Sequence, residues 1–217
     1  MARKEDISSS VIKRLPRYYR FIGELIAEGR TRISSADLAA QMSLTASQIR
    51  QDLNCFGGFG QPGCGYFLPD LHSEIGRILG LDRHRKAILI GAGNLGRAIA
   101  IHMKFESFGM TLCGIFDTDE NKTGLTVAGM KILPMTEIRD FIAEKHPEAA
   151  ILCIPRESAE ECTDLLVSCG IKAFWNFSHY DLTAKHKDII AENVHLGDSL
   201  MLLSYGLNNS ESSENES

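Results

Sequence analysis

Long hydrophobic runs are missing from this 217-residue sequence. None approaches the ~20 residues that a membrane-spanning helix needs, and the first ten residues, MARKEDISSS, lack the apolar core of a signal peptide. Cys-x-x-C pairs and the Cys/His spacings of metal sites are missing too. These absences predict a cytoplasmic protein that holds no metal.

Six cysteines are nevertheless present. Cys113 and Cys153 lie in apolar runs, which is typical of reduced core residues. Cys55 and Cys64 lie in a glycine-rich segment that solvent could reach. A redox role for either of these two thiols therefore stays open as an alternative.

A catalytic set is also missing. A Tyr-x-x-x-Lys pair is absent, since Tyr180 and Lys185 are five residues apart. His179 and His195 are the best candidates for an enzymatic proton donor, with a surface or interface position as the alternative. The sequence therefore favours a protein that binds a ligand without transforming it.

The net charge of −5 is divided unevenly along the chain. Residues 1–86 carry 13 Lys and Arg against 9 Asp and Glu, a charge of +4, whereas residues 87–217 carry 10 against 19, a charge of −9. A mildly basic N-terminal third in an acidic chain indicates an anionic partner for that third.

Three helices are predicted in the N-terminal third. Apolar residues at helical spacing predict the first over residues 11–26, which Pro16 either starts or bends. Ser34 or Ser35 can cap a short second helix, and a capping box, TASQ (45–48), opens the third. Two short capped helices joined by a tight turn are typical of a helix-turn-helix. A generic helical cap is the alternative.

A glycine-rich stretch, GGFGQPGCGYFL (57–68), follows these helices. Glycine-rich strands bounded by turns predict a hairpin. A hairpin directly after a helix-turn-helix is a wing, whose glycines let the backbone approach a surface closely. A connecting helix over residues 70–80 and a boundary at LDRHRK (81–86) complete this part of the chain.

Strand and helix patterns alternate from residue 87 onward. Strands are predicted at 87–91, 110–117, 149–155, 172–177 and 194–196, with helices at 94–105, 136–145 and 158–169. This alternation predicts a parallel sheet with helical crossovers. A last helix is predicted over 198–207, followed by a polar tail that is expected to be disordered.

A dinucleotide-binding fingerprint, GAGNLG (91–96), joins the first of these strands to its helix. Gly91 permits the tight turn, Gly93 lets a pyrophosphate approach the backbone, and Gly96 lets the helix pack on the sheet. The helix N-terminus offers free N–H groups to the phosphates. Asp117, 21 residues beyond Gly96, can accept the ribose hydroxyls and favours NAD(H) over NADP(H).

The sheet uses most of the residues that follow the fingerprint, so no evident substrate domain remains. This favours a nucleotide sensor over an enzyme. One alternative is a small NAD-dependent oxidoreductase with a helical accessory domain. Another is a Rossmann module that binds coenzyme A or a sugar nucleotide, for which Asp117 is a weaker fit.

Several segments together resemble the Rex family of bacterial repressors, which sense the NADH/NAD⁺ ratio. They are RLPRYYR (14–20), SSADLA (34–39), QIRQDLNCFGGFGQPGCGY (48–66), GAGNLG (91–96), FDTDENKTG (116–124), CIPRESA (153–159), GIKAFWNF (170–177) and ENVHLGDSLMLLSYGL (192–207). They occur in the family's order and span nearly the whole chain.

The resemblance implies an α/β protein with four parts: a winged-helix DNA-binding domain (1–82), a Rossmann domain for NAD(H) (83–196), a C-terminal helix swapped between the subunits of a homodimer (197–207), and a disordered tail (208–217). It also implies a repressor that binds an inverted-repeat operator in double-stranded DNA and is released when NADH binds. No reaction is catalysed in this family.

The resemblance further implies roles for individual residues. Those expected to bind NAD(H) are Gly91, Ala92, Gly93, Asn94, Leu95, Gly96, Asp117 and Pro155. Those expected to contact DNA are Arg14, Arg17, Gln48, Arg50, Gln51 and, in the wing, Tyr66. Those expected in the switch and dimer region are Arg20, His102, His195 and Leu196.

The chain departs from the family's usual residues in both regions. Gln51 replaces a common Lys and Gln61-Pro62 a basic pair, which should weaken phosphate attraction and its salt dependence. His195 replaces an Asp that would pair with an arginine at the position of Arg20. Since imidazole titrates near neutrality, a pH-sensitive switch is expected.

Two further departures lie in the same switch region. The sequence Asn176-Phe177-Ser178-His179 stands where Asn-Phe-Ala-Pro is usual, and His102 stands where a Tyr is common.

Overall fold

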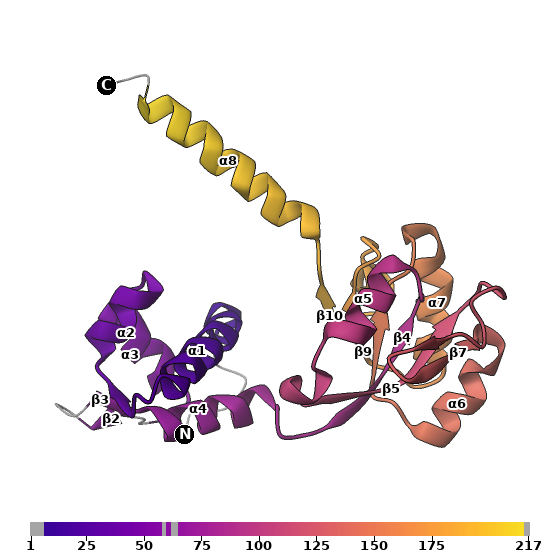
Figure 1. Cartoon of the computed structure of the whole chain (residues 1–217), viewed down its shortest axis with the longest axis horizontal. Coiled ribbons are helices and arrows are strands. Elements are labelled where there is room, and N and C mark those ends of the chain that lie inside the picture. The colour runs from indigo at the N-terminus through magenta and orange to yellow at the C-terminus, as the bar shows by residue number, and fades with distance from the viewer. Residues whose placement is uncertain (1–6, 58–59, 62–64, 215–217) are drawn as a thin grey trace. The chain divides into compact units, whose positions relative to one another are not determined.

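The computed structural model describes residues 7–57, 60–61 and 65–214, which form two compact units divided between Arg83 and His84 (Figure 1). The sequence predicted a division after residue 82. Each unit has hydrophobic clusters of its own.

The N-terminal unit combines a helix-turn-helix with a small antiparallel sheet. Its elements are α1 (Ser9–Ala27), β1 (Arg32–Ile33), α2 (Ser35–Met42), α3 (Ala46–Asn54), β2 (Gly60–Gln61), β3 (Gly65–Phe67) and α4 (Leu68–Leu79). The strand order is β1-β3-β2, and β2 and β3 form the predicted hairpin. The loop that joins them lies outside the described residues.

The two short helices begin as their capping residues predict. The Ser34 hydroxyl accepts the Asp37 N–H at 3.0 Å, and the Thr45 hydroxyl accepts the Gln48 N–H at 3.1 Å. The Gln48 side chain donates to Asp52, one turn further along, so the structure shows the Thr45 half of the predicted capping box. Pro16 lies inside α1, and the helix continues on both sides of it.

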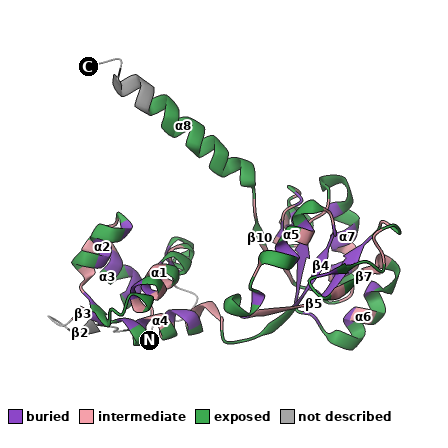
Figure 2. Cartoon of the chain, viewed as in Figure 1, coloured by how far each residue is buried: buried purple, intermediate pink, exposed green. Residues whose placement is uncertain are grey.

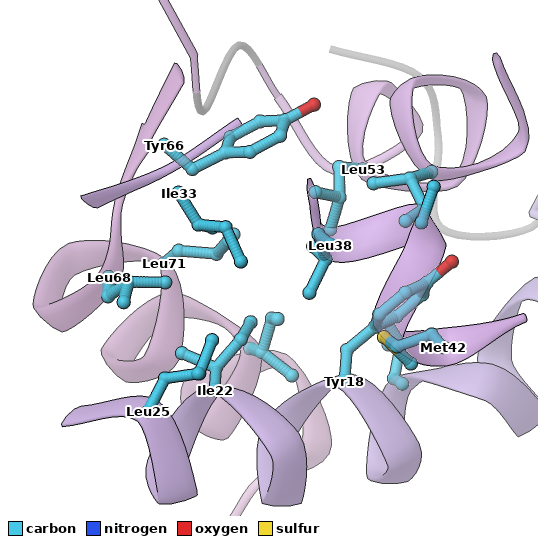
Figure 3. Close-up of a cluster of buried hydrophobic side chains, with 14 residues drawn as sticks. Tyr18, Ile22, Leu25, Ile33, Leu38, Met42, Leu53, Tyr66, Leu68 and Leu71 are labelled. Atoms are coloured by element: carbon cyan, nitrogen blue, oxygen red, sulfur yellow. The ribbon is translucent and has the colours of Figure 1, made fainter. Parts of the chain in front are cut away.

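One face of each N-terminal helix contributes to a shared core. Figure 3 shows Tyr18 and Ile22 from α1, Leu38 from α2 and Leu53 from α3 converging on one cluster. Tyr66 belongs to this cluster and is only 6% exposed. Its ring therefore supports the wing from inside, which differs from the expected position on the DNA-facing surface.

The C-terminal unit is a doubly wound sheet. Its elements are β4 (Arg85–Ile90), α5 (Asn94–His102), β5 (Met110–Asp117), β6 (Thr126–Val127), β7 (Met130–Pro134), α6 (Ile138–Lys145), β8 (Ala149–Leu152), α7 (Arg156–Ser168), β9 (Ala173–Asn176), β10 (Ile190–Asn193) and α8 (Leu196–Glu214). The strand order is β10-β9-β8-β4-β5-β7-β6. All neighbours are parallel except β6 and β7.

Both faces of the central strand β4 are buried, as is usual for a parallel sheet. Ile88 and Ile90 pack in the cluster that includes residues of α6 and α7, whereas Ala87 and Leu89 pack in the cluster that includes residues of α5. The helices therefore cover both faces and leave the carboxyl ends of the strands as the place for a ligand.

The last strand is Ile190–Asn193, and the predicted strand at 194–196 is wrong. This is an edge strand, and Ile190 is 72% exposed. An edge strand with so little apolar burial gives a weak sequence pattern, so its position was misread.

The final helix α8 extends beyond its predicted end at residue 207 to Glu214. Residues 208–214 were expected in the disordered tail, but Asn, Ser and Glu can continue a helix that is already formed. The described side chains of α8 are exposed along its length (Figure 2).

A helix long and apolar enough to cross a membrane is not found among the described residues.

Candidate nucleotide cleft and nucleic-acid interface

The nucleotide cleft lies where β4 and β8 run side by side. Ile90 pairs with Leu152, so the loops that follow these two strands meet at the carboxyl edge of the sheet. Gly91 has a φ of +95°, and a Cβ there would lie 2.4 Å from the Cys153 carbonyl oxygen. A side chain at position 91 would therefore clash with backbone as well as strain it.

The other two fingerprint glycines differ in what surrounds them. A Cβ on Gly96 would lie 1.9 Å from the Gly91 carbonyl oxygen, which makes Gly96 essential for packing α5 against the loop. A Cβ on Gly93 would have no atom within 4 Å. Gly93 precedes the first residue of α5, so this open space lies at the helix N-terminus, where an anion binds well.

A cleft of about 760 Å³ opens at this edge, within the usual size of small-molecule sites. It is lined by Ile90, Gly91, Gly93, Asn94, Leu95, Asp117, Thr118, Asp119, Lys122, Met135, Cys153, Ile154, Pro155, Ser158, Glu161, Cys162 and Leu165. Six of the eight predicted NAD(H) residues are among them. The other two do not line the cleft: the Ala92 N–H donates to Asp117, and Gly96 packs against the Gly91 carbonyl.

Asp117 is buried at the end of β5 and is held mainly by backbone. Its two carboxylate oxygens accept the Ala92 N–H at 2.7 Å and the Asp119 N–H at 2.8 Å. The Lys122 ammonium lies 3.2 Å from one of these oxygens, and this hydrogen bond raises the pKa of Lys122. The carboxylate is thus locked in one orientation at the cleft wall.

Lys122 is a cleft residue that the sequence analysis did not single out. It lies 3.2 Å from Asp117 and 3.5 Å from Asp119, so a cation lies between two acids at the place expected for the ribose. The sequence feature that could have identified Lys122 is its spacing within FDTDENKTG, where it follows Asp117 by five residues.

The thiols of the cleft are unreactive in this fold. Burial raises the pKa of Cys153 and of Cys162 to about 12, so both are protonated at neutral pH. Cys55 lies on the N-terminal unit and its thiol lies 3.3 Å from the Gln51 carbonyl oxygen. Cys64 lies outside the described residues.

The exposed face of α3 presents two of the expected DNA-contacting side chains. Arg50 and Gln51 are both exposed, and the Arg50 guanidinium donates to the Ser35 hydroxyl at 3.0 Å. Arg17, on α1, is exposed and donates to the Met42 carbonyl oxygen at 2.6 Å. These side chains can reach a duplex without disturbing the core.

Two other expected DNA contacts are turned inward. Arg14 and Gln48 both donate to the carboxylate of Asp52, which is only 1% exposed. Tyr18 donates to the same carboxylate from inside the core. The structure thus gathers these residues around one buried acid.

The switch residues lie in both units. Arg20 is exposed on α1 of the N-terminal unit, whereas His102, at the end of α5, and His195 are exposed in the C-terminal unit. Leu196 begins α8 and is also exposed.

His195 contacts a second histidine that also departs from the family pattern. Its Nδ1 lies 2.7 Å from Nδ1 of His179, while the ring centroids are 4.9 Å apart. The two nitrogens therefore point at one another along a hydrogen bond that needs one proton between them. His179 has a φ of +59°, which the family's usual proline could not adopt.

A buried asparagine holds the loop that carries His179. Asn176 donates to the Tyr180 carbonyl and to the Asn193 side chain, both at 2.8 Å. It accepts the Ser178 hydroxyl at 2.6 Å. The positions that precede α8 are thereby tied to the end of β9.

Comparison with known proteins matches each unit to a protein-family model. Residues 6–54 match the family model "Putative DNA-binding protein N-terminus", and residues 82–180 match the CoA binding domain. The redox-sensing transcriptional repressor Rex of Caldanaerobacter subterraneus is 49% identical over 97% of this chain and 94% of its own length. The Clostridium perfringens repressor of the same name is 46% identical over 97% and 99%.

The chain belongs to the Rex family. Its fold matches the crystal structure of RSP in complex with β-NAD⁺ and operator DNA, with a TM-score of 0.88, 48% identity and 96% of each chain covered. It also matches RSP in complex with β-NADH, with a TM-score of 0.89, 45% identity and coverage of 98% and 99%.

Family membership confirms the predicted fold class, a winged helix followed by a Rossmann domain. It also confirms a transcriptional repressor in place of the alternative oxidoreductase, since the Rex relatives are repressors. A group of three or more metal-binding side chains is not present in the part of the chain that the structure describes.

Proposed function

We propose that this protein is a cytoplasmic, homodimeric repressor that binds an inverted-repeat operator and leaves it when NADH binds. One observation carries the proposal: a single chain joins an exposed recognition helix to a cleft with a complete dinucleotide fingerprint. A ligand that changes only the populations of two states can release DNA without any chemical step.

A gel shift with an AT-rich inverted-repeat duplex tests this function. We expect a complex in the presence of NAD⁺ and its loss when NADH is added. A complex that is insensitive to NADH would contradict the sensing role, and NADH oxidation with a substrate would favour the oxidoreductase.

Shared contacts cannot distinguish the two forms of the cofactor. The fingerprint loop and Asp117 would bind the pyrophosphate and the adenosine ribose, which are identical in NAD⁺ and NADH. The reduced nicotinamide is neutral and the oxidised one is cationic, so an apolar pocket favours NADH. We assign this selection to the segment after Pro155 and to Leu196 of a partner subunit.

The exposed leucines of α8 support the homodimer. Apolar side chains of Leu196, Leu200, Met201, Leu202, Leu203, Tyr205 and Leu207 are 57–72% exposed in the single chain. A helix of this kind is unfavourable in water and is expected to pack against a second copy as the swapped helix. The double substitution Leu200→Glu/Leu203→Glu should give monomers in analytical ultracentrifugation, and an unchanged dimer would contradict this assignment.

Arg20, His102 and His195 are proposed as the residues that relay NADH binding to the DNA-binding unit. The contact between His195 and His179 places a titratable pair directly before α8. A relay of this composition would respond to pH as well as to NADH.

A further inference from the structure

The carboxylate of Asp52 is the centre of a buried hydrogen-bond network between α1 and α3. It accepts the Arg14 Nε–H at 2.6 Å and the Arg14 Nη2–H at 2.7 Å, which form a bidentate pair. It also accepts the Tyr18 hydroxyl at 2.8 Å and the Gln48 amide at 2.8 Å. Four donors from three side chains therefore converge on one acid.

The titration of these groups agrees with a charged carboxylate. Burial alone would raise the pKa of Asp52, but the hydrogen bonds from Arg14, Tyr18 and Gln48 outweigh it and lower the pKa. Burial and the same hydrogen bond raise the pKa of Tyr18, so its hydroxyl stays a donor. The Asp52 carboxylate is therefore charged at neutral pH and accepts all four of these hydrogen bonds.

The network fixes the orientation of α3. Asp52 and Gln48 are one turn apart on α3, and Arg14 and Tyr18 are one turn apart on α1. The bonds from Arg14 and Tyr18 to Asp52 cross from α1 to α3 and resist rotation of α3 about its own axis, whereas the Gln48 bond lies within α3. A rotation of this kind would move Arg50 and Gln51 away from a groove.

We propose that Asp52 is the positioning residue of the DNA reader, and that Arg14 and Gln48 act through it instead of contacting DNA. The guanidinium of Arg14 is already neutralised by a buried acid, so it contributes little attraction for phosphate. Base reading then rests on Arg50 and Gln51. The inference rests on the proposed function, in which this unit binds an operator.

Salt dependence separates a positioning arginine from a phosphate contact. Each lost phosphate contact reduces the slope of log K against log [salt] by about 0.9, or about twice that for a dimer. We expect Arg14→Gln to weaken binding to an AT-rich inverted-repeat duplex with an unchanged slope. Arg17→Gln is the matched control on the same helix, because Arg17 pairs with a carbonyl and keeps its net charge, and it should reduce the slope.

The second part of the test asks whether a substitution at Asp52 restores the operator affinity that Arg14→Gln loses. Arg14→Gln leaves the Asp52 carboxylate buried without its cation. The double variant Arg14→Gln/Asp52→Asn removes that charge, so it should regain most of the lost operator affinity and keep the wild-type slope. A reduced slope in either variant, or an absence of rescue, would overturn the inference.

The same titrations separate the inference from the function on which it rests. Wild-type protein that fails to bind the duplex contradicts the repressor function itself. Wild-type protein that binds, together with a reduced slope for Arg14→Gln, contradicts only the role of Asp52. Circular dichroism of each variant reports whether the helices are retained, and the double variant still tests the slope if the single variant unfolds.

Discussion

Among the residues that the structure describes, each unit buries one carboxylate beneath the surface that is proposed to bind its ligand, and the two are held by different means. Asp52 in the DNA-binding unit is bonded by side chains alone: Arg14, Tyr18 and Gln48. Asp117 in the nucleotide unit is bonded by two backbone N–H groups and by Lys122. Both acids are less than a tenth exposed.

The difference determines what each acid can do. Backbone donors are fixed by the fold, so Asp117 is preorganised by the same turn that shapes the phosphate loop. Side-chain donors can rotate away, so the position of α3 depends on a network that one substitution can disrupt. The nucleotide unit should therefore be most sensitive to changes in backbone geometry, and the DNA-binding unit to changes in charge.

The largest effect is expected at Gly96. Alanine there would place Cβ 1.9 Å from the Gly91 carbonyl oxygen, and overpacking of this kind costs about 3 kcal/mol. Gly96→Ala should destabilise the C-terminal unit, as reported by fluorescence of Trp175, its single tryptophan. Gly93→Ala is the matched control, since its Cβ meets nothing. Equal stabilities of the two variants would show that the loop relaxes.

The next largest effect is expected when the Asp52 network loses its cation. Arg14→Met leaves the buried carboxylate with only Tyr18 and Gln48 as donors, and the unfolding free energy should fall by about 2 kcal/mol. Hydrogen exchange of α1 and α3 amides measures the loss where it occurs. Exchange that accelerates equally in β4 and β8 would argue against a local network.

The sequence predicted the backbone geometry of the cleft better than the orientation of the side chains on α1 and α3. Fingerprint spacing encodes backbone geometry, so Gly91, Gly96 and Asp117 could be placed from the sequence. The roles of Arg14 and Gln48 depend on which way a side chain turns, and no local pattern specifies that Asp52 receives them. A lone aspartate on a short helix gives no sign of its four donors.

The position of Tyr66 in the wing and the position of the edge strand were harder to predict, because the sequence patterns there are weaker. Tyr66 follows a run of glycines, which predicts an exposed hairpin, yet its large ring fills the core under β3. The strand at 190–193 is an exposed edge, so its apolar pattern is faint. Burial that arises from distant segments cannot be read from a few neighbouring residues.

A smaller effect concerns the charge on Asp52. Because the folded-state pKa of Asp52 lies below its ordinary value of 3.8, its stabilisation is present above that value and is lost as the pH falls through the lower folded value. Asp52→Asn should be less stable than wild type at pH 7 by about 1 kcal/mol, and the difference should shrink as the pH falls below 3.8. Urea unfolding followed by circular dichroism across this pH range tests this, and a difference that does not change with pH would exclude the charged form as the cause.

The smallest effect concerns the histidine pair, which lies in neither network. One proton joins the two Nδ1 atoms of His179 and His195, and the nearby charge is Arg156, whose guanidinium donates to the His179 carbonyl at 3.3 Å. Loss of this bond should change the NADH concentration that releases DNA by about threefold, the equivalent of one neutral hydrogen bond. His195→Phe keeps an aromatic ring beside His179 and cannot make the bond, so a gel-shift titration with NADH should show this change. A titration curve of His195→Phe that is identical to that of wild type would remove the pair from the switch.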